Sequence, residues 1–201
     1  MTIFKYDENE LEYLKKKDEQ LGMFIEQIGK LEREVTPDLF SALISSIVSQ
    51  QISTKAAATV WNRLKERLKE VTPQSVVHTS IEDIQQCGLS TRKATYIKGI
   101  ADAVINGDID LKELAHLSDE DVIKRLSALN GIGVWTAEML LLFSLQRSDI
   151  VSYNDLGIRR GMMRLYGLED LTKDQFNTYK ERYSPYGSVA SLYLWELGNK
   201  K

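Results

Sequence analysis

The chain has 201 residues, enough for one large hydrophobic core or two modest lobes, and its 43% hydrophobic and 27% charged residues are typical of globular proteins. No apolar run is long enough to span a membrane and no signal-peptide pattern opens the chain, so we expect a cytoplasmic or nucleoid-associated protein with no membrane partner and no secretion signal. The net charge of −3 argues mildly against a nucleic-acid partner, although a local basic face remains allowed. The single cysteine, Cys87, excludes an internal disulfide, a cysteine-based zinc site and a four-cysteine iron–sulfur cluster, and we expect a buried, inert thiol.

Helical periodicity dominates the chain, and strand-type alternation is scarce. The sequence therefore predicts an all-α fold, with residues 1–35 also helical in pattern. Thr36-Pro37 and Thr72-Pro73 each place a proline at a predicted first helical position, and Ser118 with Asp121 forms a variant of the capping box. In chain order the predicted segments are 7–18, 20–34, 37–49, 53–69, 73–78, 80–86, 90–106, 110–115, 119–128, 133–145, 155–166, 172–182 and 187–199.

Residues 129–139 read LNGIGVWTAEM, in which Gly131 and Gly133 separate an amphipathic segment from a strongly apolar one. We expect a turn too tight for side chains at both glycine positions, since glycine permits positive φ and the close approach of another backbone. The N–H groups around these glycines point outward at a helix N-terminus, where the helix dipole favours a phosphate. The pattern indicates a helix–hairpin–helix that binds a DNA backbone without a lysine. A plain helix–turn–helix with glycine caps, packed in the core, is the alternative.

Asp155 lies between the apolar pair Ile150-Val151 and a predicted helix that opens with Leu156. An aspartate in this place is an N-cap by default. The same place keeps a carboxylate ionised beside helix N–H groups, which suits a general base or a group that stabilises a cation. The two interpretations are compatible.

Four stretches, in this order and at these spacings, resemble the helix–hairpin–helix (HhH-GPD) DNA glycosylase superfamily, and within it the 3-methyladenine DNA glycosylase II group. They are ALISSIVSQQISTKAAATVWNRL (42–64), GLSTRKATYIKGIADAV (88–104), LNGIGVWTAEMLLLFSL (129–145) with DIVSYNDLGIRRG (149–161), and YSPYGSVASLYLWEL (183–197). The resemblance covers about residues 36–198. It implies two helical lobes flanking a DNA-binding cleft: a central lobe of residues 36–148 with the hairpin, and a second lobe formed by residues 1–35 and 149–201.

The resemblance also implies site residues. Asp155 matches the essential aspartate, and Gln50 and Gln51 match the loop that probes the minor groove, with Gln51 favoured as the residue that fills the gap left by an extruded nucleotide. Without the resemblance, these glutamines read as a polar turn ahead of a helix capped by Ser53 or Thr54. The hairpin residues expected at the DNA backbone are Gly131, Ile132, Gly133 and Thr136. The backbone carbonyls of Ser127, Leu129 and Ile132 are expected to hold Na⁺ or K⁺ only with DNA bound; no cofactor is required.

Trp135 stands where bifunctional members of the superfamily have a lysine that attacks the sugar, so the resemblance implies a monofunctional enzyme that uses water. Trp135 and Trp195 are expected in the base pocket, Trp195 because it matches the family's C-terminal pocket tryptophan. Tyr153 is added from its place beside Asp155. Stacking on a cationic base favours aromatic walls, although a core role is at least as common for any one aromatic residue.

The leading hypothesis is a monomeric DNA glycosylase that flips alkylated purines, of the 3-methyladenine and 7-methylguanine type, out of damaged duplex DNA and hydrolyses the glycosidic bond with the help of Asp155. The alternatives are a glycosylase for deaminated purines and a non-catalytic helix–hairpin–helix DNA-binding module. Two positions depart from the family pattern: Tyr153 replaces a proline before the aspartate, and Gly187 replaces an arginine.

Overall fold

The computed structural model describes residues 2–199 and confirms the all-α prediction, apart from one small two-stranded sheet. Contacts divide the chain into two compact units, Thr36–Leu140 and Met1–Val35 with Leu141–Lys201. The second boundary therefore lies inside α9 (Val134–Phe143), eight residues before the predicted limit at residue 148. The reason is that Phe143 stacks on Trp195 and Ser188 donates its N–H to the carbonyl of Ser148, so both residues are held by the C-terminal part of the chain.

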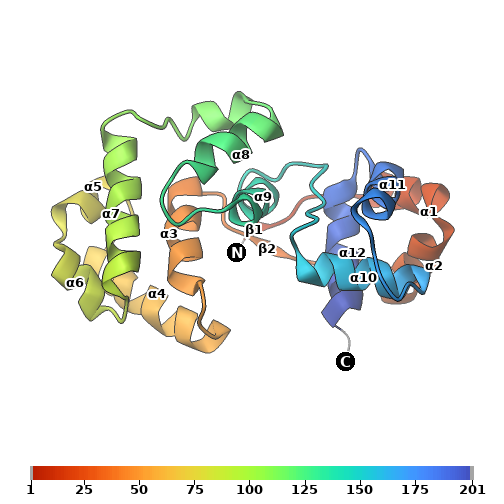
Figure 1. The fold of residues 1–201 in the computed structure, drawn as a ribbon, viewed down its shortest axis with the longest axis horizontal. Coiled ribbons are helices and arrows are strands. Elements are labelled where there is room, and N and C mark those ends of the chain that lie inside the picture. The colour runs from red at the N-terminus through yellow and green to blue at the C-terminus, as the bar shows by residue number, and fades with distance from the viewer. Residues whose placement is uncertain (1, 200–201) are drawn as a thin grey trace. The chain divides into compact units, whose positions relative to one another are not determined.

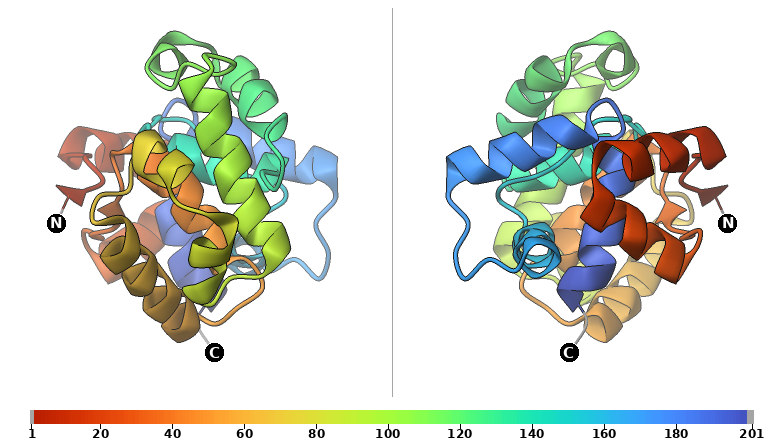
Figure 2. Two further views of the ribbon diagram at one scale, coloured as in Figure 1. Left: turned by 90° about the vertical axis from the view of Figure 1, so that its left-hand side faces the viewer. Right: turned by 90° about the vertical axis from the view of Figure 1, so that its right-hand side faces the viewer.

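In the unit Thr36–Leu140, α7 (Thr91–Ile105) packs against α3 (Leu39–Ser49), α5 (Pro73–His78) and α6 (Ile81–Gln86), as Figures 1 and 2 show. The helix α4 (Thr54–Leu68) packs against α3 and α6. A buried stripe of Ala94, Ile97, Ile100 and Ala101 has the spacing of one helix face, which explains the central place of α7. The unit continues through the 3₁₀ helix η1 (Glu113–His116), which lies in the predicted segment 110–115, and α8 (Asp119–Ser127) to the start of α9.

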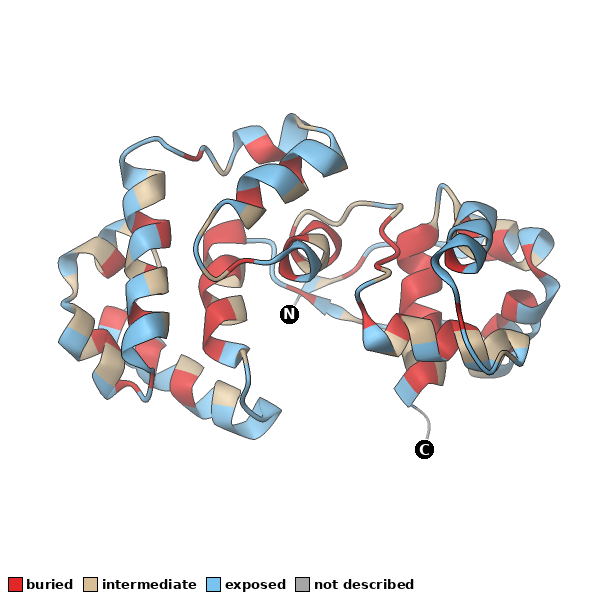
Figure 3. Ribbon diagram, in the orientation of Figure 1, coloured by how far each residue is buried: buried red, intermediate tan, exposed pale blue. Residues whose placement is uncertain are grey.

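The other unit contains β1 (Thr2–Ile3), α1 (Glu8–Lys17), α2 (Glu19–Ile28), β2 (Glu34–Val35), α10 (Leu156–Tyr166), α11 (Lys173–Tyr183) and α12 (Gly187–Asn199). The first eight residues of α12 are all buried, as the red ribbon in Figure 3 shows. α12 packs most extensively against α10. The two helices cross closely because Gly161 and Gly198 carry no Cβ, which at either position would overlap the backbone of the other helix.

Two predictions about the N-terminal part of the chain are wrong. The helix expected over 20–34 ends at Ile28, because Gly29 takes a positive φ of 74°, and residues 34–35 instead pair as β2 with β1 in antiparallel register. Pro37 does not begin α3; Asp38 is its N-cap and accepts the N–H of Ser41 at 2.7 Å. An aspartate is the stronger N-terminal signal here, since its side chain satisfies one of the unpaired N–H groups of the first turn.

None of the helices within residues 2–199 is both long and apolar enough to cross a membrane. Cys87 is buried, and burial raises the pKa of its thiol, in agreement with the inert side chain expected.

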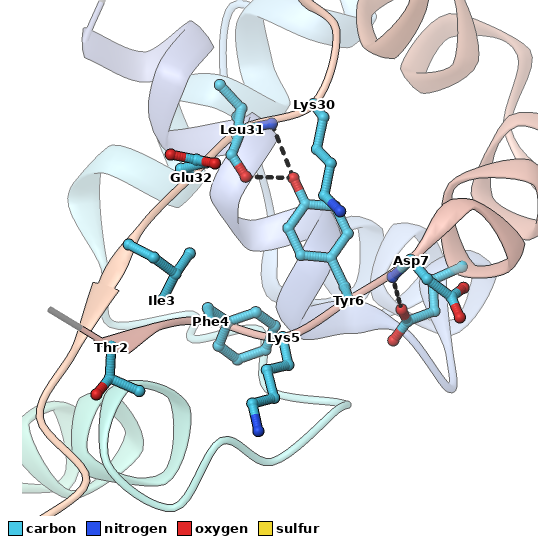
Figure 4. Close-up of a pocket in the computed structure, with 10 residues that line it drawn as sticks. Thr2, Ile3, Phe4, Lys5, Tyr6, Asp7, Lys30, Leu31 and Glu32 are labelled. Carbon is cyan, nitrogen blue, oxygen red and sulfur yellow. Dashed lines mark hydrogen bonds between the residues drawn. The ribbon is translucent and has the colours of Figure 1, made fainter.

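A pocket of about 740 Å³ lies beside the N-terminal strand, lined by residues 2–7, 10 and 30–32 (Figure 4). Two of the lining residues, Tyr6 and Leu31, are joined by hydrogen bonds: the Tyr6 hydroxyl donates to the carbonyl of Leu31 and accepts the N–H of Leu31. No site residue expected from the sequence lines this pocket.

Candidate functional site

The two hairpin glycines have different environments. Gly131 has a φ of 89°, and a Cβ there would lie 2.5 Å from Tyr96 Cδ2 and 2.8 Å from Ile47 Cδ1, so neither the backbone nor the packing admits a side chain. Gly133 has no positive φ, and nothing lies within 4 Å of a Cβ built on it. The expectation of a turn too tight for side chains is therefore wrong for Gly133. Its missing side chain leaves space on the outside of the turn, at the start of α9.

The hairpin presents the first turn of α9. The carbonyl of Gly133 accepts the N–H of Ala137 at 3.0 Å, so Gly133 occupies the N-cap position, and the first N–H groups of a helix have no carbonyl partner within that helix. Ile132 and Thr136, both expected at the DNA backbone, are buried beside this turn. Trp135, in the same turn, is 46% exposed.

The sequence predicts a monovalent cation at the backbone carbonyls of the hairpin. The carbonyl of Leu129 accepts the N–H of Ile132, and the Ser127 hydroxyl is buried with no hydrogen-bond partner. A buried hydroxyl without a hydrogen-bond partner is compatible with a bound cation that takes oxygen ligands. The cation remains a prediction that these residues suit.

The segment 50–53 between α3 and α4, which we call the wedge loop, carries the two predicted wedge residues. The Gln50 side chain donates to the carbonyl of Gly131 at 2.8 Å and is therefore tied to the hairpin. Gln51 is exposed and has a φ of 58°, in the left-handed region that residues other than glycine rarely adopt. Ser53 then caps α4 through the N–H of Ala56, as the polar-turn interpretation expects.

Asp155, in the other unit, is the N-cap of α10 and is only 7% exposed. Its Oδ1 atom accepts the N–H of Ile158 at 2.9 Å and the indole N–H of Trp195 at 2.7 Å. Donors from two different helices thus fix the orientation of one carboxylate. The N-cap prediction is confirmed, and the second donor is an addition to it.

Trp195 reaches this carboxylate because Gly157 leaves room for it. A Cβ at Gly157 would lie 2.6 Å from Trp195 Cδ1 and 3.1 Å from Asp155 Oδ1. The indole ring also stacks on Phe143, with ring centroids 5.4 Å apart. The tryptophan expected from the sequence as a pocket wall therefore also positions the aspartate.

Tyr153 is enclosed by neighbours in its own unit. The guanidinium of Arg159 lies 4.9 Å above its ring, and Phe176 meets it edge to face at 5.1 Å. Arg159 follows Asp155 by one helical turn, and its Nε is buried without a hydrogen-bond partner. Tyr153, which stands where the family pattern has a proline, thus anchors this arginine, while its place as a base-pocket wall stays a prediction.

The departure at Gly187 has a direct physical cause. The N–H of Gly187 donates to Asp149 Oδ1 at 3.0 Å, and a Cβ there would approach that oxygen to 2.6 Å. Asp149 also accepts the hydroxyl of Ser184 at 2.6 Å. Any side chain at 187, an arginine included, would therefore have to displace the Asp149 carboxylate that accepts the Gly187 N–H.

Three residues of these sites were not singled out from the sequence: Gly157, Lys93 and Tyr96. Gly157 carries a usable signal, since a glycine inside the first turn of a helix is unfavourable unless another element approaches closely. Lys93 donates from α7 to the carbonyls of Val48 and Gln50, and Tyr96 lies beneath Gly131. Neither has a local signal, because both partners are distant in the sequence.

A glycine hairpin that leads into one helix, followed along the chain by a helix capped with a buried aspartate, is the arrangement expected of a helix–hairpin–helix DNA-repair protein. Residues 44–185 match the HhH-GPD superfamily of base excision DNA repair proteins, and the chain belongs to this family.

Its relatives include a DNA-3-methyladenine glycosylase 1 of Schizosaccharomyces pombe, 40% identical over 162 residues that cover 78% of this chain and 71% of that protein. The crystal structure of a DNA-3-methyladenine glycosidase from Bacillus halodurans superposes with a TM-score of 0.89 at 36% identity, over 100% of this chain and 94% of that chain. A 3-methyladenine DNA glycosylase of S. pombe in complex with abasic DNA gives a TM-score of 0.81 at 34% identity, over 94% of this chain and 95% of that chain.

Proposed function

We propose that the protein is a monofunctional DNA glycosylase that removes alkylated purines, of the 3-methyladenine and 7-methylguanine type, from duplex DNA in base excision repair. The observation that carries the proposal is Asp155, a buried carboxylate fixed by two N–H donors at the start of α10 in a member of the HhH-GPD family. Relatives named as 3-methyladenine DNA glycosylases support the same substrate class. The enzyme acts as a monomer on DNA in the cytoplasm or nucleoid.

The chemistry suits one fixed carboxylate. A purine alkylated at N3 or N7 is already cationic, so the bond between the sugar C1′ and the base breaks readily and its electron pair leaves with the base. The sugar becomes an oxocarbenium ion, whose positive charge the carboxylate of Asp155 stabilises. The oxygen of a water molecule then bonds to C1′, and the water gives up a proton to a proton acceptor. Asp155 can serve as this general base.

The hairpin holds the DNA while the base is extruded. A phosphate binds the N–H groups at the start of α9, where Gly133 leaves space. The carbonyls of Ser127, Leu129 and Ile132 are the ones that would hold a monovalent cation, whose positive charge would favour the same phosphate. Flipping a nucleotide costs a few kcal/mol, and less for a damaged base that pairs poorly. Gln51 fills the gap, while Trp135, Trp195 and Tyr153 are the candidate walls for the flipped base.

We expect no lyase activity, because Trp135 has no amine to form a Schiff base with the opened sugar. Borohydride reduction of the enzyme with methylated or abasic duplex should give no covalent protein–DNA product. The positive control is a lyase of the same superfamily under the same conditions. Trapping at a level comparable to the control would contradict the monofunctional assignment.

The test of the whole proposal is release of free base from methylated duplex DNA, with the bases separated by chromatography. Wild-type protein should release 3-methyladenine or 7-methylguanine, and Asp155→Asn should lose at least about a hundredfold in single-turnover rate while still binding DNA. Asn keeps the N-cap, so the fold is retained.

Asp18 offers a matched control for this substitution. It is also buried and also an N-cap, and it accepts the Leu21 N–H, the Tyr166 hydroxyl and a charged group of Arg182. Asp18→Asn should lower stability and leave the rate of base release in the folded enzyme unchanged. Release of deaminated purines instead of alkylated ones would change the substrate class, and DNA binding with no release of any base would indicate a non-catalytic module.

A further inference from the structure

One face of α7 touches both loops that the proposed function assigns to DNA. Lys93 Nζ donates to the carbonyls of Val48, at 2.9 Å, and Gln50, at 2.5 Å, where α3 gives way to the wedge loop. Tyr96, three residues later and so on the same side of the helix, lies directly beneath Gly131 of the hairpin. Burial lowers the pKa of Lys93, and the positive charge of neighbouring Arg92 lowers it further.

The wedge loop needs such support because its backbone is strained. Gln51 has a φ of 58°, a backbone conformation in which a residue other than glycine persists only where the surrounding structure holds it. The residue before it is held twice: Lys93 binds the carbonyl of Gln50, and the Gln50 side chain binds the carbonyl of Gly131. The strain is thus confined to Gln51, whose side chain is exposed.

The same contacts join the two loops to each other. The hydrogen bond from Gln50 Nε2 to the Gly131 carbonyl spans 81 positions in the sequence and fixes the wedge loop to the hairpin turn. A side chain engaged in this bond cannot at the same time enter a DNA duplex. The two adjacent glutamines therefore have different tasks.

We propose that Lys93, Gln50 and Tyr96 form a support that holds the wedge loop and the hairpin as one piece, so that Gln51 alone enters the duplex. Gln50 and Lys93 are then positioning residues that act through Gln51. This inference rests on the proposed DNA-binding function. It adds that, within the unit Thr36–Leu140, one residue enters the duplex and others hold it in position.

The experiment is a double-mutant cycle on DNA affinity that requires no base release. Binding is measured to two duplexes, one undamaged and one with a tetrahydrofuran abasic analogue, and the ratio of the two dissociation constants reports how well the gap is filled. Gln51→Ala should lower the preference for the abasic duplex about fivefold. Lys93→Met should lower it by a similar factor, and the double variant should be little worse than either single one, because Gln51 is effective only where Lys93 positions it.

Lys98→Met is the matched control. Lys98 lies on the same helix and donates to the carbonyls of Val76, Val77 and Thr79 at the end of α5. Lys98→Met removes hydrogen bonds of the same kind, from a lysine of α7 to backbone carbonyls, and should leave the preference for the abasic duplex unchanged. Gln50→Met keeps the length of the side chain but not the donor, and should lower both the preference and the affinity for undamaged DNA, since it also releases Gly131.

The outcomes separate this inference from the proposed function. If the losses of abasic-duplex preference in Lys93→Met and Gln51→Ala multiply in the double variant, the proposed support by Lys93 is wrong. The same follows if Lys98→Met lowers the preference as much as Lys93→Met does. In both cases the proposed DNA binding is unaffected. If Gln51→Ala keeps the preference for the abasic duplex and Gln50→Met loses it, Gln50 is the side chain that enters the duplex. This result would also contradict the inference. Failure of the wild type to bind either duplex would defeat both proposals.

Discussion

The helices α9 and α10 begin in the same way but with opposite chemistry. In each, the carbonyl of the N-cap residue accepts an N–H four residues later at 3.0 Å: Gly133 from Ala137, and Asp155 from Arg159. At α10 the aspartate side chain also accepts the N–H of Ile158, so the helix end carries its own anion. At α9 the glycine brings no side-chain acceptor, and the space around its missing side chain is open.

In the proposed function, this difference lets one structural element serve two tasks. A helix N-terminus carries about half a positive charge, which attracts whatever anion reaches it. Where the sequence supplies the anion, the helix fixes a carboxylate for chemistry on a cation. Where the sequence supplies only glycine, the helix end suits an anion from outside, such as a DNA phosphate. In the proposed function, the choice of one N-cap residue therefore separates the end that acts on the glycosidic bond from the end that binds DNA.

The largest effect is expected from Gly157→Ala, which disturbs the catalytic end. Its Cβ would lie 2.6 Å from Trp195, so the indole must move away from Asp155. We expect the single-turnover rate to fall about a hundredfold, as for other small misplacements of catalytic groups, with DNA affinity unchanged. Gly99→Ala is the control: it lies inside α7 with open space around it and should stabilise the protein. A rate for Gly157→Ala equal to that of Gly99→Ala would show that the close contact is unimportant.

A smaller effect is expected on stability when the two hairpin glycines are compared. Gly131→Ala requires a positive φ and a shift of Tyr96 and Ile47, so it should lower the free energy of unfolding by about 2 kcal/mol. Gly133→Ala should change it by less than about 1 kcal/mol, because neither the backbone nor any neighbour opposes it. Chemical denaturation of both variants measures the difference. Equal losses would mean that Gly133 is also a packing residue.

The smallest effect is expected from Trp195→Phe, which removes the indole donor and keeps an aromatic ring against Phe143. Losing one hydrogen bond to a charged group should lower the single-turnover rate about tenfold. Binding of an abasic-analogue duplex should be unaffected. A weaker binding of that duplex at an unchanged rate would instead assign Trp195 to the pocket wall alone.

Features set by local rules could be predicted from the sequence. The helices over 73–78 and 187–199 match their predicted limits. Asp155 is the N-cap expected, and Ser53 is the one of the two candidates Ser53 and Thr54 that caps α4, because capping depends on a few consecutive residues. Local capping rules were insufficient before α3, where Pro37 favours a helix that begins at Pro37 and Asp38 favours one that begins a residue after it. The family and the fold class could also be inferred, since four motifs at defined spacings carry the resemblance.

The contacts that distinguish neighbouring residues could not be predicted. Gly131 and Gly133 look equivalent in the sequence and differ only because Tyr96, on α7, lies beneath one of them. Gln50 and Gln51 are likewise identical in type, and only the distant Gly131 carbonyl and Lys93 assign them different tasks. Such distinctions come from packing between segments that are far apart in the chain.

The most direct test of the division between the two helix ends is a crossed measurement on Gly133→Asp and Asp155→Asn. For each variant, the affinity for undamaged duplex and the rate of base release at saturating enzyme are measured together. An aspartate at 133 gives α9 its own anion and should weaken binding to all duplexes about tenfold or more without unfolding the protein, while bound DNA still reacts. Asp155→Asn should bind normally and release base at least about a hundredfold more slowly than the wild type. If Gly133→Asp binds undamaged DNA as the wild type does, or if Asp155→Asn releases base at the wild-type rate, the two helix ends do not have the tasks assigned to them.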